Sequence, residues 1–383
     1  MKILLLIAVL LFTFSCAEKS SEEIYQGKLE EFFEGDFILE KDSATTNINL
    51  QKTISYNGER FFVSREDQGY SLFSVESGKK EFSFKIPKEG PLSLKGHAIA
   101  YQVFDDNEFV AVSSQGNVKR YIDGMQVKEM NLDWTDYQER MLIQMSDQGD
   151  NFRKIDSNRY QLINNPFDIF DEEKSVDLNY RKWVVEFDLE KGWVCASDFT
   201  APLGEEFSHS ASASSVITVY NDQRDEFYLI FAPSDTLFQI QNCKVIRKIA
   251  LKSNTELKFL PGIYEQNGKN KKWRNNPESA SNSVLLFDSV NQLYVRNFVV
   301  KTEETQPEIT DIRKRQGLNK RNHLILIYDL DWKLKAELEI SYDVGQTGGQ
   351  MISSNGWILI SKPEQKSEDE YEFYKIDLSQ FAD

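Results

Sequence analysis

Two basic segments carry the side chains best suited to bind an anion. The first, 268–274, has a tryptophan among its cations, and the second spans 313–321. The candidate ligand-binding residues are Lys271, Lys272, Trp273, Arg274, Arg313, Arg315, Lys320 and Arg321. Arginine offers paired, planar hydrogen bonds to an oxyanion, and tryptophan offers a face for stacking. The alternative is that both segments are solvated loop tips, paired with the acidic segment 168–177.

Catalytic chemistry has no comparable signature. The sequence contains no Gly-x-Ser-x-Gly, no Walker loop, no His-Glu-x-x-His and no Cys-x-x-Cys. His209 stands between two serines, but adjacent side chains on a strand point apart, so we interpret it as a loop or core residue. His97 and His323 precede expected strands and are interpreted as structural. We predict no catalytic residue, no cofactor and no metal ligand.

The first of the three cysteines lies in an export signal. Residues 1–15 combine one lysine with an apolar run of about ten residues, which is too short to span a bilayer and typical of a signal peptide. A small residue precedes Cys16 and a polar segment follows it, as in a bacterial lipoprotein signal. We therefore predict a signal peptide over 1–15, lipidation of Cys16 and a tether over 16–35. The alternative is an ordinary secretory signal with a chance cysteine.

The other two cysteines are Cys195 and Cys243. Cys195 falls within an expected strand and Cys243 within an expected turn. A disulfide between them is compatible with an oxidising compartment, but the differing strand positions argue against it. We interpret Cys195 as a buried free thiol.

Composition excludes several classes of protein. The 383 residues include 13% aromatic and 40% hydrophobic residues, which is too apolar for a disordered chain. With 45 Lys+Arg against 61 Asp+Glu, the formal charge is −16. A chain this acidic is repelled by phosphate backbones, so a nucleic-acid ligand is not expected. We expect a monomer.

One short sequence pattern recurs along the chain. It consists of an apolar strand, an acidic or amide residue, a tight turn and another strand. Its six copies place that residue at positions 76, 123, 188, 241, 329 and 377, at spacings of 47, 65, 53, 88 and 48 residues. The short spacings match one four-stranded propeller blade, and the long ones need insertions. The sequence thus predicts an all-β protein, a six-bladed β-propeller over 36–383. A seven-bladed propeller is the alternative, which would assign 282–301 and 324–340 to two units.

The last unit, 349–378, has only three expected strands, whereas Phe37–Glu40 has no unit of its own. We predict that this N-terminal strand completes the last blade and closes the ring, which removes an open sheet edge. Within a blade, the recurring turn would join the third strand to the fourth. The long segments 133–157, 165–181, 199–211, 252–281 and 301–322 then all fall on the opposite face.

A lipoprotein-type signal, this length, and six degenerate units ending in motifs such as Ile376-Asp377-Leu378 resemble an uncharacterised family of six-bladed propeller lipoproteins of Bacteroidetes. The resemblance implies the propeller fold and a location at the outer membrane of a Gram-negative bacterium. The protein would face the periplasm or the cell surface. It implies no catalytic residues.

Three hypotheses about the function of the protein remain. The favoured one is a membrane-anchored recognition propeller that binds a partner protein, peptide or anionic glycan on its insertion-rich face. The second is a lactonase-, hydrolase- or lyase-like enzyme acting at the axial channel, which would bring carboxylates or a metal to the axis. The third is a scaffold subunit of an envelope complex.

Overall fold

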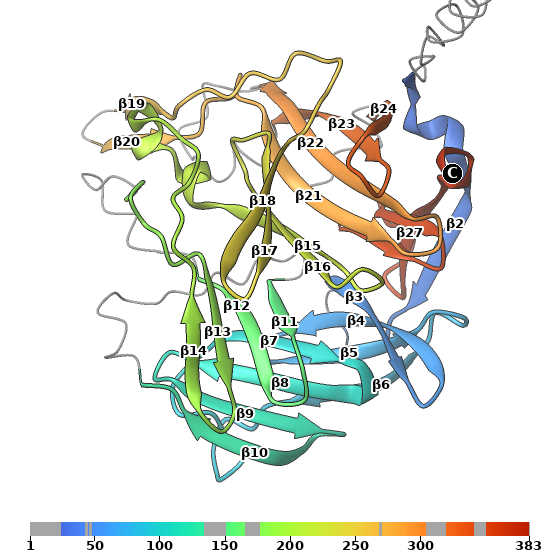
Figure 1. The fold of residues 1–383 in the computed structure, drawn as a ribbon. Coiled ribbons are helices and arrows are strands. Elements are labelled where there is room, and N and C mark those ends of the chain that lie inside the picture. Colours follow the sequence, from blue (N-terminus) through green and yellow to red (C-terminus); the bar gives the residue numbers. More distant parts are fainter. Residues whose placement is uncertain are drawn as a thin grey trace, which may run out of the picture.

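The structure, a computed structural model, describes residues 24–42, 45, 48–133, 151–164, 177–267, 270–303, 319–340 and 350–382. Within these ranges the regular elements are strands and short 3-10 helices (Figure 1). The helices are η1 (Leu29–Phe32), η2 (Asp105–Asn107), η4 (Glu205–His209), η5 (Ala211–Ser214) and η6 (Ser379–Phe381). The prediction of an all-β chain is therefore confirmed.

Most of the described strands belong to six four-stranded antiparallel arrays, which are the blades of a propeller. Blade 1 contains β3 (Leu50–Tyr56), β4 (Glu59–Glu66), β5 (Gly69–Ser74) and β6 (Lys80–Lys85). Blade 2 contains β7 (Ala98–Phe104), β8 (Glu108–Ser113), β9 (Asn117–Ile122) and β10 (Met125–Asn131). Blade 3 contains β11 (Phe152–Lys154), β12 (Arg159–Ile163), β13 (Val184–Asp188) and β14 (Gly192–Ala196).

Blade 4 contains β15 (Val216–Asn221), β16 (Glu226–Phe231), β17 (Thr236–Gln241) and β18 (Lys244–Ala250). Blade 5 contains β21 (Ser281–Asp288), β22 (Leu293–Glu303), β23 (Lys320–Tyr328) and β24 (Leu334–Ile340). Blade 6 contains β25 (Met351–Ser354), β26 (Trp357–Ser361), β27 (Glu370–Asp377) and β2 (Phe33–Glu40). The first strands of neighbouring blades contact one another around the axis, as β25 does with β3 and β15 with β21.

Burial follows the position of a strand within its blade. The middle strands β5 and β8 are buried along their whole length, because each is covered on both faces by neighbouring blades. The outer strands β6 and β10 alternate between exposed and half-buried residues. This difference explains why outer strands have a period of two in the sequence, whereas middle strands are continuous apolar runs.

The N-terminal strand closes the ring. β2 pairs antiparallel with β27, with Phe37 opposite Phe373, and Leu39 is fully buried between blades 6 and 1. The predicted closure is therefore confirmed. The seven-bladed alternative is wrong, because β21 to β24 form a single sheet that includes 282–301 and 324–340.

Part of the predicted tether also packs on the propeller. β1 (Tyr25–Lys28) adds to blade 5 as a fifth strand, parallel to β24, and the buried Leu29 of η1 joins the core between blades 5 and 6. The assigned boundaries at residues 15 and 35 stay predictions.

Strand order also fixes the two faces of the ring. On one face, the connections are short in blades 1, 2 and 4, where they join second to third strands, and long elsewhere. On the other face, every connection is a short turn that joins the first strand to the second, or the third to the fourth where a fourth strand follows directly. We call the face with these turns the turn face. The long connections join second to third strands or lead to the next blade, so they leave from the opposite, insertion-rich face. They include the hairpin of β19 (Ile263–Asn267) and β20 (Asn270–Arg274). The predicted segment 133–157 is too long at its end, because it also contains β11 and part of the turn after that strand, which belong to blade 3 and the turn face.

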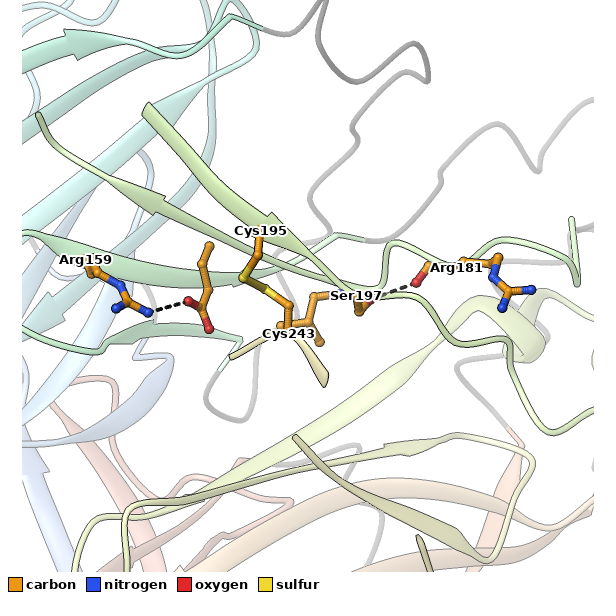
Figure 2. Close-up of a disulfide and its surroundings, with 7 residues drawn as sticks. Arg159, Arg181, Cys195, Ser197 and Cys243 are labelled. Atoms are coloured by element: carbon orange, nitrogen blue, oxygen red, sulfur yellow. Dashed lines mark hydrogen bonds and ion pairs between the residues drawn. A yellow bond between two sulfur atoms is a disulfide. The ribbon is translucent and has the colours of Figure 1, made fainter. Parts of the chain in front are cut away.

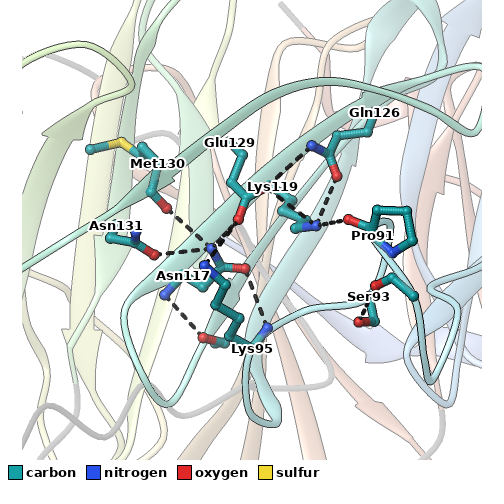
Figure 3. A network of polar contacts seen from close by, with 11 residues as sticks. Pro91, Ser93, Lys95, Asn117, Lys119, Gln126, Glu129, Met130 and Asn131 are labelled. Atoms are coloured by element: carbon teal, nitrogen blue, oxygen red, sulfur yellow. Dashed lines mark hydrogen bonds and ion pairs between the residues drawn. The ribbon is translucent and has the colours of Figure 1, made fainter.

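Polar side chains fix connections to the blades. Lys119 of β9 has only 2% of its side chain exposed, and it donates to the Pro91 carbonyl and to Gln126 Oε1 (Figure 3). The carboxylate of Glu129 lies 3.5 Å from the Lys119 ammonium. A buried cation satisfied in this way is structural, because its donors are already used.

Candidate functional site

The first basic segment lies on the hairpin between blades 4 and 5. Lys271, Lys272, Trp273 and Arg274 all belong to β20, and Trp273 pairs with Tyr264 of β19 in the hairpin register. Arg274 is half-buried. The hairpin leaves the ring on the insertion-rich face.

The second basic segment is described only at its end. Arg313 and Arg315 lie outside the described residues, whereas Lys320 and Arg321 begin β23 and are exposed. In the register of blade 5, Lys320 lies opposite Glu303 and Arg321 opposite Thr302.

The backbones of the two segments come together. The Thr302 N–H donates to the Pro277 carbonyl at 2.7 Å, three residues beyond the hairpin, and Thr302 pairs with Arg321. One corner of the insertion-rich face therefore carries both the base of the hairpin and the start of β23. The anion-binding role of these side chains stays a prediction.

A separate cavity occupies the axis of the ring. Its volume is about 930 Å³, and residues from the first strands of all six blades line it. Many lie at the ends of these strands or in the turns after them, as Ser55, Asp156 and Asn355 do. The cavity, which we call the axial pocket, is therefore built towards the turn face.

The lining of the axial pocket carries four cations and four carboxylates: Lys52, Arg60, Arg153, Lys154, Asp105, Asp106, Asp156 and Asp222. Several already have partners. Lys154 lies 2.8 Å from the Glu108 carboxylate, and Arg60 donates to Asn355 and Thr53. Asp156 accepts hydrogen bonds from the backbone of Asn158 and Arg159, which lower the pKa of its carboxyl group.

Arg153 has weaker polar contacts. Its Nη1 lies 3.8 Å from Asp225 Oδ1, and its guanidinium carbon lies 4.4 Å from the centre of the Tyr220 ring. Burial and the hydrogen bond to Asp225 raise the pKa of Tyr220 to about 12, so its hydroxyl group remains a donor. Sequence reasoning missed Arg153 because β11 has only three residues, too few to show a period.

Among the described residues, the four carboxylates of the pocket are not part of a cluster of three potential metal ligands. In the ranges that the structure describes, one group of three potential ligands is close enough to share an ion: Glu186, Cys195 and Cys243. The sulfur atoms of that group are joined to each other, so they have no thiolate to offer. The pocket thus has walls that carry charges of both signs.

The three histidines occupy different environments. His323 is buried, and its Nδ1 lies 3.0 Å from Asn297 Oδ1. Burial, together with the charge of Arg321, lowers the pKa of His323 to about 4. His209 ends η4 and His97 is exposed before β7. None of the three lines the axial pocket.

Cys195 and Cys243 form a disulfide (Figure 2), so the interpretation of Cys195 as a free thiol is wrong. Cys195 lies on β14, the outermost strand of blade 3, and Cys243 lies in the turn between β17 and β18 of blade 4. Their strand positions do differ, as predicted. The stacking of adjacent blades nevertheless places their Cα atoms 6.1 Å apart, within reach of a disulfide.

Cys16 lies outside the described residues, so its lipidation stays a prediction. Among the residues that the structure does describe, there is no helix with the length and apolar character needed to cross a bilayer.

The fold and the axial pocket define a six-bladed β-propeller scaffold. No protein-family model and no curated protein matches the sequence. Among solved structures, the chain is similar to a member of the DUF4221 family from Bacteroides vulgatus, with a TM-score of 0.67 and 13% identity over 90% of this chain and 96% of that one. It is also similar to a putative exported protein from Bacteroides fragilis, with a TM-score of 0.51 and 9% identity over 92% of this chain and 99% of that one. At these identities the likeness concerns the fold, and at that level the expected resemblance to Bacteroidetes propellers is confirmed.

Proposed function

We propose that this chain is an exported recognition propeller, anchored through Cys16, whose insertion-rich face binds a partner protein, peptide or glycan that carries anionic groups. The observation that carries the proposal is the one-sided distribution of the long connections. Loops carried by a rigid scaffold are the usual location of binding residues. Short turns on the other face leave less variable surface for a large partner.

The distribution of charge in the chain bears on whether the partner is anionic. The chain as a whole is acidic, with a formal charge of −16, so a general attraction to anions is excluded. Binding of an anionic partner therefore requires a local positive field. The corner where the base of the hairpin meets the exposed Lys320 and Arg321 is the place where such a field would form.

The proposed location in the cell envelope is supported by the signal-like segment 1–16 and by the similar fold of the putative exported protein from Bacteroides fragilis. Metabolic labelling with a radioactive fatty acid tests it. Label should enter the wild-type chain and be absent from the Cys16→Ala variant. Equal labelling of both chains, or labelling of neither, would contradict the anchor.

The partner class is tested by retention on immobilised dextran sulfate, with uncharged dextran as the control matrix. The wild-type chain should be retained only on the sulfated matrix and should elute as salt concentration rises. Replacing Lys271, Lys272, Arg313 and Arg315 together by serine should abolish retention. A matched variant with serine at the exposed turn-face residues Lys79, Lys191, Lys244 and Lys333 makes the same change in charge and should retain the wild-type behaviour.

An enzyme acting at the axial channel is the second candidate, and the four aspartates around the pocket favour it. Two of them accept backbone hydrogen bonds: Asp105 from Ser55, and Asp156 from its own turn. The contact of Asp105 links blade 2 to β3 of blade 1, and that of Asp156 holds its own turn, so both carboxylates have structural partners. A divalent ion that co-purifies stoichiometrically and is lost in Asp106→Asn or Asp222→Asn variants would favour the enzyme instead.

A further inference from the structure

The axial pocket has the dimensions of a site for a small molecule. Its volume of about 930 Å³ lies within the range of about 300 to 1,000 Å³ that is usual for small-ligand sites. All six blades contribute to its wall, so the ring holds the pocket in shape. It is built towards the turn face, away from the surface proposed above to bind a large partner.

Arg153 is the cation in this wall that the protein satisfies least. Its Nε and Nη1 atoms are buried and have no hydrogen-bond partner among the described residues. Its nearest carboxylate oxygen, Asp225 Oδ1 at 3.8 Å, instead accepts the hydroxyl of Tyr220 at 2.9 Å. A buried guanidinium whose donors lack acceptors is costly, so an oxyanion in the pocket beside it is favoured.

The position of Arg153 is fixed by aromatic rings. Its guanidinium carbon lies 4.4 Å from the centre of the Tyr220 ring and 5.4 Å from that of Phe227. Only 11% of the Arg153 side chain is exposed. A stacked guanidinium keeps its charge and its planar hydrogen-bonding edge, which matches a carboxylate.

The rest of the lining narrows the class of ligand. The four cations and four carboxylates listed above balance, so the wall has no net charge to attract a polyanion. Residues with hydroxyl groups also line it from several blades, and one hydroxyl oxygen, Ser354 Oγ, is buried without a partner among the residues described. A ligand with one negative charge and several hydroxyl groups complements such a wall.

We propose that the axial pocket binds a small monocarboxylate that also carries hydroxyl groups, such as an acidic sugar, with Arg153 receiving the carboxylate. The site is independent of the proposed insertion-rich face in both position and chemistry. Arg153 holds the negative group, and the polar wall contacts the remainder of the ligand.

Isothermal titration calorimetry of the full chain with glucuronate tests this proposal. Glucose serves as a probe that lacks the carboxylate, and citrate as one with extra charge. Glucuronate should bind more tightly than either. The Arg153→Gln variant should weaken glucuronate binding by at least about tenfold, since a charge-assisted hydrogen bond is lost. Arg181→Gln removes an equal charge from an exposed pair with Asp198 outside the pocket and should leave binding unchanged.

Thermal unfolding would establish that the Arg153→Gln variant is folded. If it is not, Ser55→Trp provides a second route, because Ser55 is exposed at the mouth of the pocket, where a large side chain should block entry. The proposal is overturned if wild-type chain binds no glucuronate, if glucose or citrate binds as well, or if glucuronate binding survives both pocket variants. None of these results bears on retention by dextran sulfate.

Discussion

Cys195 and Cys243 join the outermost strand of blade 3 to a turn of blade 4, at a sequence separation of 48. The bond thus connects two sheets that share no backbone hydrogen-bond ladder. Beside it, Glu186 of β13 is buried and forms an ion pair with Arg159 at 2.7 Å (Figure 2).

Removing this disulfide should destabilise the propeller. A cross-link over a loop of this length contributes about 2–4 kcal/mol, largely by restricting the unfolded chain. A variant with serine at both Cys195 and Cys243 should therefore unfold at a lower temperature. Wild-type chain under reducing conditions should match the variant, and reductant should not change the variant further. An unchanged melting temperature in both cases would contradict the cross-link.

The second prediction concerns β2, the strand that closes the ring, and compares substitutions at two adjacent residues of this strand. Leu39 is fully buried whereas Ile38 is 41% exposed. Leu39→Ala should reduce the free energy of unfolding by about 2–5 kcal/mol because it leaves a cavity where the ring closes. Ile38→Ala should change it by no more than about 0.5 kcal/mol. Urea unfolding measures both, and equal effects would show that β2 does not close the ring in this register.

His323 should make stability depend on pH. Burial lowers its folded-state pKa to about 4, from about 6.5 when unfolded. Between these values the unfolded chain binds a proton that the folded chain does not, so the free energy of unfolding should fall as pH decreases from 6.5 towards 4. The contribution amounts to roughly 3 kcal/mol at most.

Urea unfolding at several pH values measures this effect. His323→Gln should flatten the dependence in that window, while His97→Gln, which changes an exposed histidine, should not. A slope that persists unchanged in His323→Gln would assign it to other groups.

Glu108 should be a sensitive position between blades 2 and 3. Its buried carboxylate accepts from Arg120 at 2.6 Å, Lys154 at 2.8 Å and the Tyr160 hydroxyl at 2.6 Å. Glu108→Ala would leave these groups without their shared acceptor, and a loss of about 3–5 kcal/mol in the free energy of unfolding is expected. Glu190→Ala breaks an exposed pair with Lys128 and should cost less than about 1 kcal/mol. Similar losses for the two variants in urea unfolding would contradict this role for Glu108.

Much of the fold was predictable because its signals are local. Blades 1 to 5 repeat the turn between the third and fourth strands, as at Asp123-Gly124, and the missing fourth strand of blade 6 pointed to Phe37–Glu40. The disulfide was not predictable, because its geometry depends on how one blade stacks on the next. The pairing of Tyr25–Lys28 with β24 is equally distant in sequence.

Of the two candidate sites, one could be predicted from local sequence and the other could not. The basic segment 268–274 is conspicuous in the sequence because its cations are close together along the chain. Arg153 is not, since its importance comes from Tyr220 and Asp225, which belong to another blade. The axial pocket exists only once six separate strands are brought together around one axis.

Amide hydrogen exchange with and without dextran sulfate tests the proposed binding face most directly. The account predicts slower exchange in the connections of the insertion-rich face, including the β19–β20 hairpin and the start of β23 at Lys320. Exchange in the short turns of the opposite face, such as the one at Asp123, should not change. Protection confined to the turn face, or no protection at all under conditions of binding, would contradict the assignment of partner recognition to the insertion-rich face.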